Sequence, residues 1–303
     1  MPLLLAPAGS PEAVVAALDA GADAVYVGLA GWSRGGARGE LEWDELVAAQ
    51  RRVAAAGRKL HLALNTIPKP RERAQLFERV PLLLELGIRD LIVNDIGILA
   101  TLRRRFPDLR LTASIGCGAR TVADVAAFRD LGAYAVVLPG TVGPEEVREM
   151  GAIRGISVEI MIHMVEEFVL LGKCWMPSYL HLKPSPLPSS AAGDSREALL
   201  RETGSMKRGG VGACFKICQR PWELIEGGRS VDRRLFPSRQ ISRIAEVRAY
   251  AAAGADVLKL QGRSLPSGLL ASLVRRYREA IDGPVAEEAP PAPLPASWAA
   301  VGR

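Results

Sequence analysis

The 303-residue sequence has no apolar run close to the ~20 residues that cross a membrane as a helix, and its longest apolar stretches carry charges. Its first residues read as a strand, with no basic segment ahead of an apolar stretch, so a secretory signal is not expected. Hydrophobic residues make up 49% of the chain and charged residues 24%, as in ordinary globular enzymes. We therefore expect a cytoplasmic protein with no membrane span.

Several catalytic signatures are missing. No Gly-x-Gly-x-x-Gly follows the first predicted strand, which disfavours an open dinucleotide-binding sheet. His-Glu-x-x-His is also missing, so zinc peptidases of that type are not indicated. A cysteine peptidase would need His163 beside its thiol and would leave three cysteines without a role. The peptidase reading is therefore an alternative rather than the first choice.

Cysteine is scarce, and the four residues are Cys117, Cys174, Cys214 and Cys218. Structural disulfides are not expected in a cytoplasmic chain, because that compartment keeps thiols reduced. Cys214 and Cys218 are spaced so that both thiols can face one metal centre, across a helical turn or a tight loop. Thiolates suit iron–sulfur clusters and zinc. Four unrelated buried thiols are the alternative.

Positive charge is in modest excess, with 39 Lys and Arg against 33 Asp and Glu. A basic balance can indicate nucleic acid or another anionic partner. The arginine pairs and triplets at 51–52, 103–105, 233–234 and 275–276 fall mostly on separate predicted helices. Solvated helix faces explain them more simply, so we expect nucleic acid to be a less favoured partner than a small molecule.

Strands and helices alternate along the chain. Nearly continuous apolar runs predict eight strands, at residues 3–6, 24–28, 59–64, 90–93, 109–113, 135–138, 158–162 and 257–260. Helices are predicted from residue 11 and at 43–56, 71–86, 97–105, 122–131, 144–150, 243–253 and 269–281. This alternation predicts an α/β fold, a (β/α)8 TIM-like barrel. An open doubly wound sheet is the alternative.

The barrel is expected to form a single domain over residues 1–283. An insertion at about 164–238 follows the seventh strand and carries three of the four cysteines. Within it, residues 184–194 are rich in Pro, Ser and Ala and predict a mobile loop. Residues 284–303 are rich in Pro and Ala and predict an extended C-terminal tail.

Polar residues follow several predicted strands at their carboxyl ends, where the site of such a barrel lies. They are Asn65, Asn94, Asp95, Ser114, His163, Lys259 and Arg263. Each can instead cap a following helix, and Asp95 and Ser114 taken alone are more often caps than catalysts. Their recurrence at one rim favours function. We expect Asp95 and His163 to act in catalysis, and the other five to bind substrate.

Several segments resemble the collagenase-like peptidase family U32. They are residues 4–13 and 19–28 at the start of the chain, and residues 254–263, where the family usually has Lys-Ile-Glu-Gly-Arg. Glu159 and His163 match its Glu…His-Gly segment, and residues 172–174 match its Gly-Arg-Cys. Residues 212–224 match its Gly-x-Cys-x-x-x-Cys-Arg-x-x-Tyr-x-Leu. The resemblance covers about the whole barrel and adds Glu159 to the expected catalytic residues.

The resemblance implies an oxygen-independent hydroxylase with a 4Fe–4S cluster, despite the name of the family. Members of this kind modify transfer RNA, ribosomal RNA or ubiquinone precursors, with prephenate implicated as the hydroxyl source. The short members that act on ubiquinone work as a pair of related chains, and this chain resembles them in length. We therefore expect a small aromatic or quinone-like substrate, prephenate as the oxygen donor, and a homologous partner chain in a heterodimer.

Two positions depart from the family pattern. Glu167 stands where many members carry the first cluster cysteine, so a cluster on Cys174, Cys214 and Cys218 needs another fourth ligand. We expect Cys117 to supply it, with Glu167, water or substrate as alternatives. Gln261 replaces the Glu of the family segment. These two losses would also suit a non-catalytic, metal-stapled partner of a catalytic chain.

Two further roles stay open. His163 is either a general acid–base or a residue that packs and hydrogen-bonds, and the family match favours the first. Lys259 either faces substrate, as Arg263 is expected to do through two-pronged contacts with a carboxylate or phosphate, or points into the barrel and pairs with Glu159.

Overall fold

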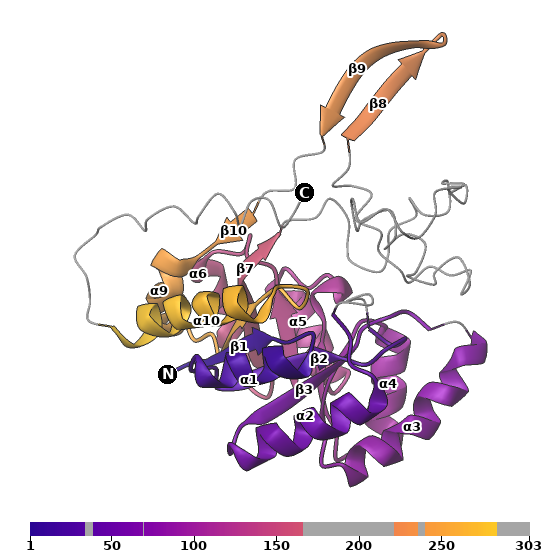
Figure 1. The fold of residues 1–303 in the computed structure, drawn as a ribbon, viewed down its shortest axis with the longest axis vertical. Helices are drawn as coiled ribbons and strands as arrows, with labels where there is room; N and C mark the ends of the chain where they lie inside the picture. The colour runs from indigo at the N-terminus through magenta and orange to yellow at the C-terminus, as the bar shows by residue number, and fades with distance from the viewer. Residues whose placement is uncertain (34–38, 69, 166–220, 236–239, 284–303) are drawn as a thin grey trace.

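A computed structural model describes residues 1–33, 39–68, 70–165, 221–235 and 240–283 (Figure 1). Within them, parallel strands follow one another around a barrel in the order of the chain, and the last of them pairs with the first. That last pairing joins the two ends of the sheet, which an open doubly wound sheet would leave apart. The predicted (β/α)8 TIM-like barrel is confirmed.

The strands of the barrel are β1 (Leu3–Pro7), β2 (Ala24–Gly28), β3 (Lys59–Leu64), β4 (Asp90–Val93), β5 (Arg110–Ala113), β6 (Ala135–Leu138), β7 (Ser157–Val165) and β11 (Val257–Leu260). The helices are α1 (Pro11–Asp19), α2 (Trp43–Ala55), α3 (Arg73–Glu85), α4 (Ile96–Arg105), α5 (Val122–Asp130), α6 (Pro144–Gly151), α9 (Val247–Ala252) and α10 (Ser267–Asp282). The strand predictions agree closely with these bounds, except that β7 continues past residue 162 and so overlaps the predicted start of the insertion.

Local signals start and end the helices where the sequence predicts. Ser10 precedes α1, and its Oγ accepts a hydrogen bond from the backbone N of Ala13 at 3.2 Å, while Pro11 occupies the first turn. Gly21 and Gly57 follow α1 and α2 with φ of 95° and 66°, a left-handed conformation that side chains rarely adopt. These turns send the chain from each helix back into the next strand.

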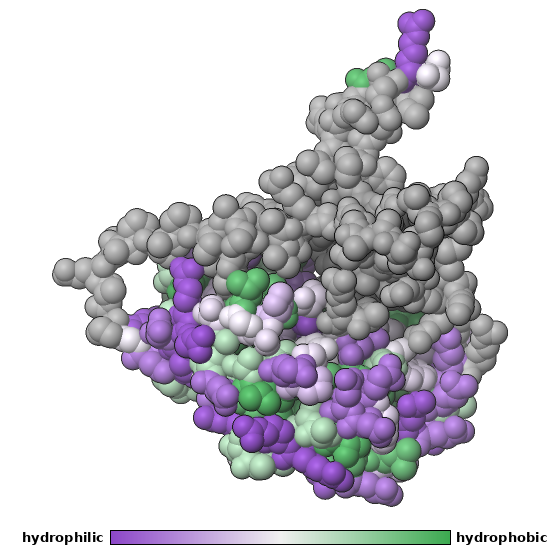
Figure 2. All heavy atoms as spheres, in the orientation of Figure 1, coloured by the Kyte–Doolittle hydropathy of each residue, from purple (hydrophilic) through white to green (hydrophobic). Residues whose placement is uncertain are grey.

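Alternate strand residues face two different environments. One set packs outward against the helices and forms the large core between barrel and helices, with Leu4, Val25 and Leu62 among its fully buried members. The other set fills the barrel and includes a small apolar cluster of Leu5, Ala24, Tyr26, Ala63, Ile92 and Val257. Polar side chains share that interior, among them Glu159 and Lys259. On the face shown in Figure 2, hydrophilic and apolar residues are interspersed over the helices.

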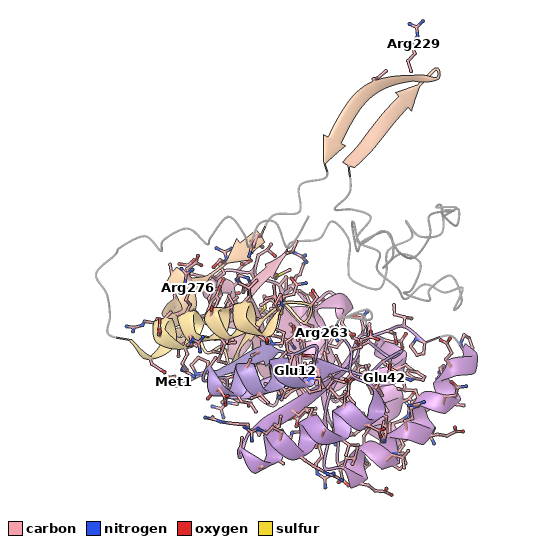
Figure 3. All side chains as sticks on the ribbon, viewed as in Figure 1. Met1, Glu12, Glu42, Arg229, Arg263 and Arg276 are labelled. Carbon is pink, nitrogen blue, oxygen red and sulfur yellow. The ribbon has the colours of Figure 1, made fainter. Side chains whose placement is uncertain are left out.

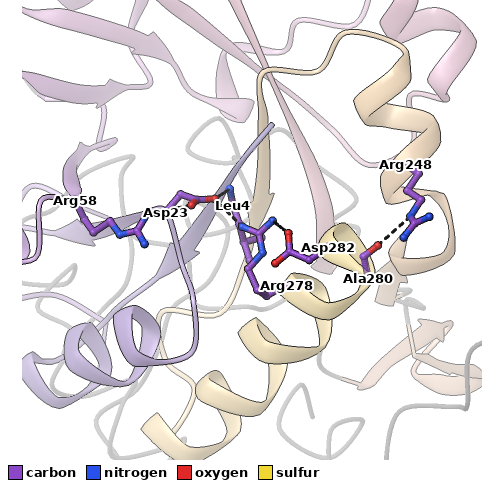
Figure 4. A network of polar contacts seen from close by, with 7 residues as sticks. All are labelled: Leu4, Asp23, Arg58, Arg248, Arg278, Ala280 and Asp282. Carbon is purple, nitrogen blue, oxygen red and sulfur yellow. Dashed lines mark hydrogen bonds and ion pairs between the residues drawn. The ribbon is translucent and has the colours of Figure 1, made fainter. Parts of the chain in front are cut away.

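A polar clamp ties the start of the chain to its last described helix (Figure 4). The Asp23 carboxylate accepts hydrogen bonds from the backbone N of Leu4 at 2.8 Å, from Arg58 Nη1 at 3.2 Å and from Arg278 Nη1 at 2.9 Å. Arg278 also bridges to Asp282 within α10. Asp23 thus joins β1, the start of β3 and α10 at the amino ends of the strands, where the barrel closes.

Two further strands fall within the predicted insertion, and a third follows it. β8 (Pro221–Glu226) and β9 (Arg229–Leu235) form an antiparallel hairpin with Arg229 at its tip (Figure 3). β10 (Gln240–Ser242) pairs antiparallel with the end of β7 and so returns the chain to the barrel. Cys174, Cys214, Cys218 and Glu167 lie outside the described residues, as do the predicted loop and tail. No helix in the described ranges is long and apolar enough to cross a membrane.

Candidate active site at the barrel mouth

Three polar residues form a row at the carboxyl ends of neighbouring strands. Asn65 follows β3, Asn94 follows β4 and Ser114 follows β5, and the pairing of these strands places the three residues at one level. Asn94 is fully buried and Ser114 is 4% exposed. Among the described residues, Asn65 Oδ1 is buried without a hydrogen-bond partner. The structure therefore brings these three predicted substrate-binding residues together as the polar row, a name kept below.

Asp95 lies next to the polar row but serves α4. Its side chain is the N-cap, and Oδ1 accepts a hydrogen bond from the backbone N of Ile98 at 2.8 Å. This is the capping geometry that satisfies a free N–H at a helix start. A catalytic role for Asp95 stays a prediction, whereas its capping role is visible.

Lys259 and Glu159 form an ion pair inside the barrel. Lys259 Nζ lies 2.8 Å from Glu159 Oε2, and the two side chains are 6% and 1% exposed. Thr112 Oγ1 donates to the other carboxylate oxygen at 3.4 Å, and the ammonium lies 5.1 Å from the centre of the Tyr26 ring. Of the two roles that the sequence leaves open for Lys259, the structure shows the pairing with Glu159. The positive charge of Lys259 is therefore balanced by Glu159 inside the barrel.

Two other polar side chains of the interior were not expected to belong to a site. Tyr26 donates its hydroxyl to the backbone O of Leu260 at 2.9 Å, and burial raises its pKa to about 12, so the phenol stays neutral. His61 is 8% exposed, its Nδ1 has no partner in the described part of the chain, and burial lowers its pKa. A tyrosine and a histidine within apolar strands give no sequence signal beyond core packing.

Arg263 is the cation at the rim. Its Nη1 donates to Ser33 Oγ at 2.7 Å, and Ser33 Oγ donates to Glu40 Oε1 at 2.9 Å. The guanidinium carbon lies 5.9 Å from the centre of the Tyr26 ring, and Figure 3 shows Arg263 near the start of α10. A Cβ at Gly28 would lie 2.2 Å from Arg263 Nη1 and 2.0 Å from Ser33 Oγ. Glycine at this position therefore makes the room in which the arginine sits.

Charge at Arg263 is only partly balanced. Burial lowers the pKa of its guanidinium from a very high ordinary value, which leaves the group charged at neutral pH. Within the described ranges it forms no ion pair with a carboxylate, since Ser33 stands between it and Glu40. A half-buried guanidinium of this kind is suited to hold a carboxylate or phosphate. Ser33 and Glu40 were not predicted, because their connection to Arg263 spans most of the chain.

His163 faces away from the polar row. The register between β7 and β11 shifts between Lys259 and Leu260, and this irregularity turns His163 toward α10. Its Nδ1 lies 3.3 Å from Tyr277 Oη and its Nε2 lies 3.2 Å from Gln240 Nε2. Burial lowers the pKa of His163 to about 4, so the ring is neutral at physiological pH. The structure thus shows a packed, hydrogen-bonded histidine, and general acid–base catalysis by it stays a prediction.

Cys117 is at the rim, where the sequence predicts. It ends the short 3-10 helix η2 (Ile115–Cys117) that follows Ser114, and it is half-buried with Sγ 3.5 Å from the backbone O of Val93. The described residues contain no group of three or more potential metal ligands. The thiol fits a thiolate-bound centre in chemistry and position, because β7 leads from the same rim into the segment that carries the other cysteines.

A model of peptidase family U32 matches residues 9–299. The tRNA hydroxylation protein P of Escherichia coli is 25% identical over 93% of this chain and 68% of its own length. The 23S rRNA 5-hydroxycytidine synthase of the same organism is 27% identical over 94% of this chain and 40% of its own length. The collagenase of Porphyromonas gingivalis is 22% identical over 92% of this chain and 65% of its own length.

The fold has a counterpart among solved structures. That of the U32 peptidase Mk0906 aligns with a TM-score of 0.54 and 13% identity, over 88% of this chain and 95% of that one. Two of the curated relatives are named for RNA, which runs against the expected ranking of nucleic acid below a small molecule. The chain spans 40% to 68% of the three curated relatives. The family match over nearly all its residues shows that this chain belongs to peptidase family U32.

Proposed function

We propose that this chain is an oxygen-independent hydroxylase, or the catalytic part of one, that modifies RNA with the help of a thiolate-bound 4Fe–4S cluster. The observation that carries the proposal is the family match, together with relatives named for hydroxylation of tRNA and for synthesis of a hydroxylated cytidine in 23S rRNA. These names favour RNA over the small aromatic or quinone-like substrate that the sequence suggested. The small substrate becomes the second candidate.

The cluster is assigned to Cys174, Cys214 and Cys218, with Cys117 as the fourth thiolate. When bound, a 4Fe–4S cluster supplies one-electron chemistry close to the substrate. The proposal for Cys117 is supported by its place at the rim beside the polar row and by its half-buried thiol. Glu167 is the alternative ligand.

The polar row is suited to orient a nucleobase. RNA is read mostly through unpaired bases, whose edges are hydrogen-bonded by side chains in a pocket. The amides of Asn65 and Asn94 each offer a donor and an acceptor, and the Ser114 hydroxyl offers both. Because Asn65 Oδ1 has no partner among the described residues, it is suited to accept a hydrogen bond from an exocyclic amine.

Arg263 is assigned to an anionic group at the same mouth. A phosphate of the RNA or a carboxylate of the oxygen donor would fit the guanidinium, and prephenate is a carboxylate donor of the expected kind. Lys259 does not compete for this role, because Glu159 already neutralises it. Arg263 is thus assigned to bind the anionic group, and the polar row beside it to orient the nucleobase.

Two alternatives make different predictions. The described residues contain no Cys–His pair that could catalyse peptide hydrolysis, since Cys117 contacts Val93 and His163 faces Tyr277. A non-catalytic partner role, with a homologous chain in a heterodimer, rests on Glu167 and Gln261. The Gln261 amide oxygen accepts a hydrogen bond from the backbone N of Val165 at 2.6 Å, so this residue holds the end of β7.

Nucleoside mass spectrometry tests the proposal. The chain, purified and loaded without oxygen, is supplied with an electron donor, prephenate, and tRNA and rRNA from cells that lack it. We expect one nucleoside to gain the mass of one oxygen atom, and Arg263→Gln to reduce that gain. Hydroxylation of a phenol or quinone precursor instead would favour the small substrate. Peptide hydrolysis by metal-free protein would favour the peptidase, and activity only with a second chain would favour the partner role.

A further inference from the structure

Unpaired cations gather at the end of the barrel opposite the mouth, on three consecutive turns. These turns join α2 to β3, α3 to β4 and α4 to β5. Their cations without a carboxylate partner in the described residues are Arg51, Arg52, Lys59, Arg89, Arg103, Arg104 and Arg105. The carboxylates of the same turns that are not already in an ion pair are Glu85 and Asp108. We call these seven cations the basic end surface.

The three turns are adjacent. β3, β4 and β5 are neighbours in the barrel, and the backbone N of Arg110 donates to the backbone O of Arg89 at 2.8 Å. A Cβ at Gly87 would lie 3.6 Å from Gln50 Nε2, which puts the end of α2 against the next turn. All the cations of the surface except Arg103 are exposed. They therefore form one surface rather than the separate helix faces that the sequence suggested.

The helix dipole does not account for this surface. Cations are favoured at the carboxyl end of any helix, which predicts a similar excess at every turn on this end of the barrel. Elsewhere the pattern differs: Arg278 is paired with Asp23 (Figure 4), and Arg129 is paired with Asp130. The end of α6 and the turn after it also carry Arg148 and Arg154, but with Glu149 beside them, so the net excess of cations is largest on the three turns of the basic end surface.

We propose that the basic end surface is a second contact site for RNA, distant from the mouth that receives the reacting nucleotide. The inference rests on the proposed function in taking RNA as the substrate class. Exposed cations without carboxylate partners gain free energy from a polyanion by releasing its condensed counterions, whereas paired cations gain little. Apart from β7, the barrel strands have four to six residues, which makes the wall at most about 20 Å tall. A folded RNA is therefore long enough to reach both ends.

Aromatic rings next to the surface extend it along α3 and α4. Arg105 stacks over Phe77 at 4.8 Å and over Phe106 at 5.5 Å, measured from the guanidinium carbon to the ring centres. Stacking holds this guanidinium at the surface without neutralising it. Arg79 stacks over Trp32 at 6.0 Å on the same side of the barrel. Arg105 and Arg79 are thus two stacked cations on this side of the barrel, where Glu78 and Glu85 of α3 are also exposed.

Two matched triple variants test this site. The first is Arg51→Gln/Arg89→Gln/Arg104→Gln. The control, Arg129→Gln/Arg148→Gln/Arg154→Gln, removes the same charge from the same end of the barrel in another sector. Fluorescence anisotropy measures binding of bulk tRNA to the full chain between about 50 and 200 mM salt. We expect the first triple to weaken binding at least about tenfold at low salt and to flatten the salt slope by about 2 to 3, and the control to change it much less.

A short oligonucleotide separates this site from the active site. The first triple should hydroxylate a short single-stranded substrate like the wild type while losing activity on whole tRNA. Equal weakening by both triples would mean diffuse attraction by net charge and would overturn the site, as would no weakening by the first. Binding to phosphatidylserine vesicles in place of tRNA would assign the surface to a membrane. If the variants overturn the second contact site but the wild type still hydroxylates RNA, the proposed function stands. If the wild type neither binds nor hydroxylates RNA, both the site and the proposed function are wrong.

Discussion

Lys259 and Glu159 meet at 2.8 Å in the interior of the barrel, with both side chains almost completely buried. Removal of one partner leaves the other charge buried and unpaired, which costs far more than the net contribution of the pair. We expect Lys259→Met to lower the free energy of unfolding by about 3–5 kcal/mol. The double variant Lys259→Met/Glu159→Leu should lose clearly less. Urea denaturation measures both, and equal losses would contradict a buried pair.

Gly28 makes room for the rim arginine. Because a Cβ there would lie about two ångströms from Ser33 Oγ and Arg263 Nη1, Gly28→Ala must displace one of them. We expect kcat/KM for RNA hydroxylation to fall by about tenfold or more, about 1.4 kcal/mol, with Arg263→Gln giving a similar loss. Gly268→Ala is the matched control, since a Cβ there meets no atom within 4 Å. Indistinguishable activity of Gly28→Ala and Gly268→Ala would exclude this role for Gly28.

His163 should make stability depend on pH. Its pKa is about 4 in the fold and ordinarily 6.5, so below pH 6.5 the unfolded chain takes up a proton that the folded chain does not. The stabilising contribution is therefore complete above about pH 6.5 and declines as the pH falls toward 4. We expect the difference in unfolding free energy between wild type and His163→Gln to shrink by up to about 3 kcal/mol over this range.

Denaturation at a series of pH values measures that difference. His61 and the carboxylates are present in both proteins, so their titration cancels from it. A difference that stays constant or widens as the pH falls would contradict the buried, neutral histidine. An imidazole titration by NMR near the ordinary value would do the same.

Cys117 is expected to be a cluster ligand. Cys117→Ala should lower the iron and sulfide bound per chain, while Ser114→Ala, three residues away on the same rim, should keep them. Both variants are purified without oxygen and analysed for metal and sulfide. A full load on Cys117→Ala would remove this assignment and make Glu167→Gln the next variant to measure.

The barrel could be predicted because its strands are buried on both faces, which makes them nearly continuous apolar runs such as residues 90–93. Glycines with positive φ, such as Gly21, marked the helix ends for a similar local reason. Sequence patterns of this kind are short in range. They fixed the order of elements and the row of polar residues at the strand ends, including Asn65 and Asn94.

Contacts between residues far apart in the chain could not be predicted from the sequence. The register shift that turns His163 toward Tyr277 is an irregularity of a kind that redirects a side chain with little trace in composition. The contact of Arg263 with Ser33 joins residues that are 230 positions apart. The basic end surface was missed because its arginines lie on separate helices, and the pairing of β3, β4 and β5 brings those helix ends together.

The most direct test of the account is the content of iron, sulfide and zinc, with a visible spectrum, in the chain purified without oxygen. The account predicts iron and sulfide at close to four of each per chain, with the broad visible absorption of a thiolate-bound 4Fe–4S cluster. A colourless protein that holds one zinc ion, or no metal, would contradict redox hydroxylation and would leave the hydrolase and partner roles to pursue.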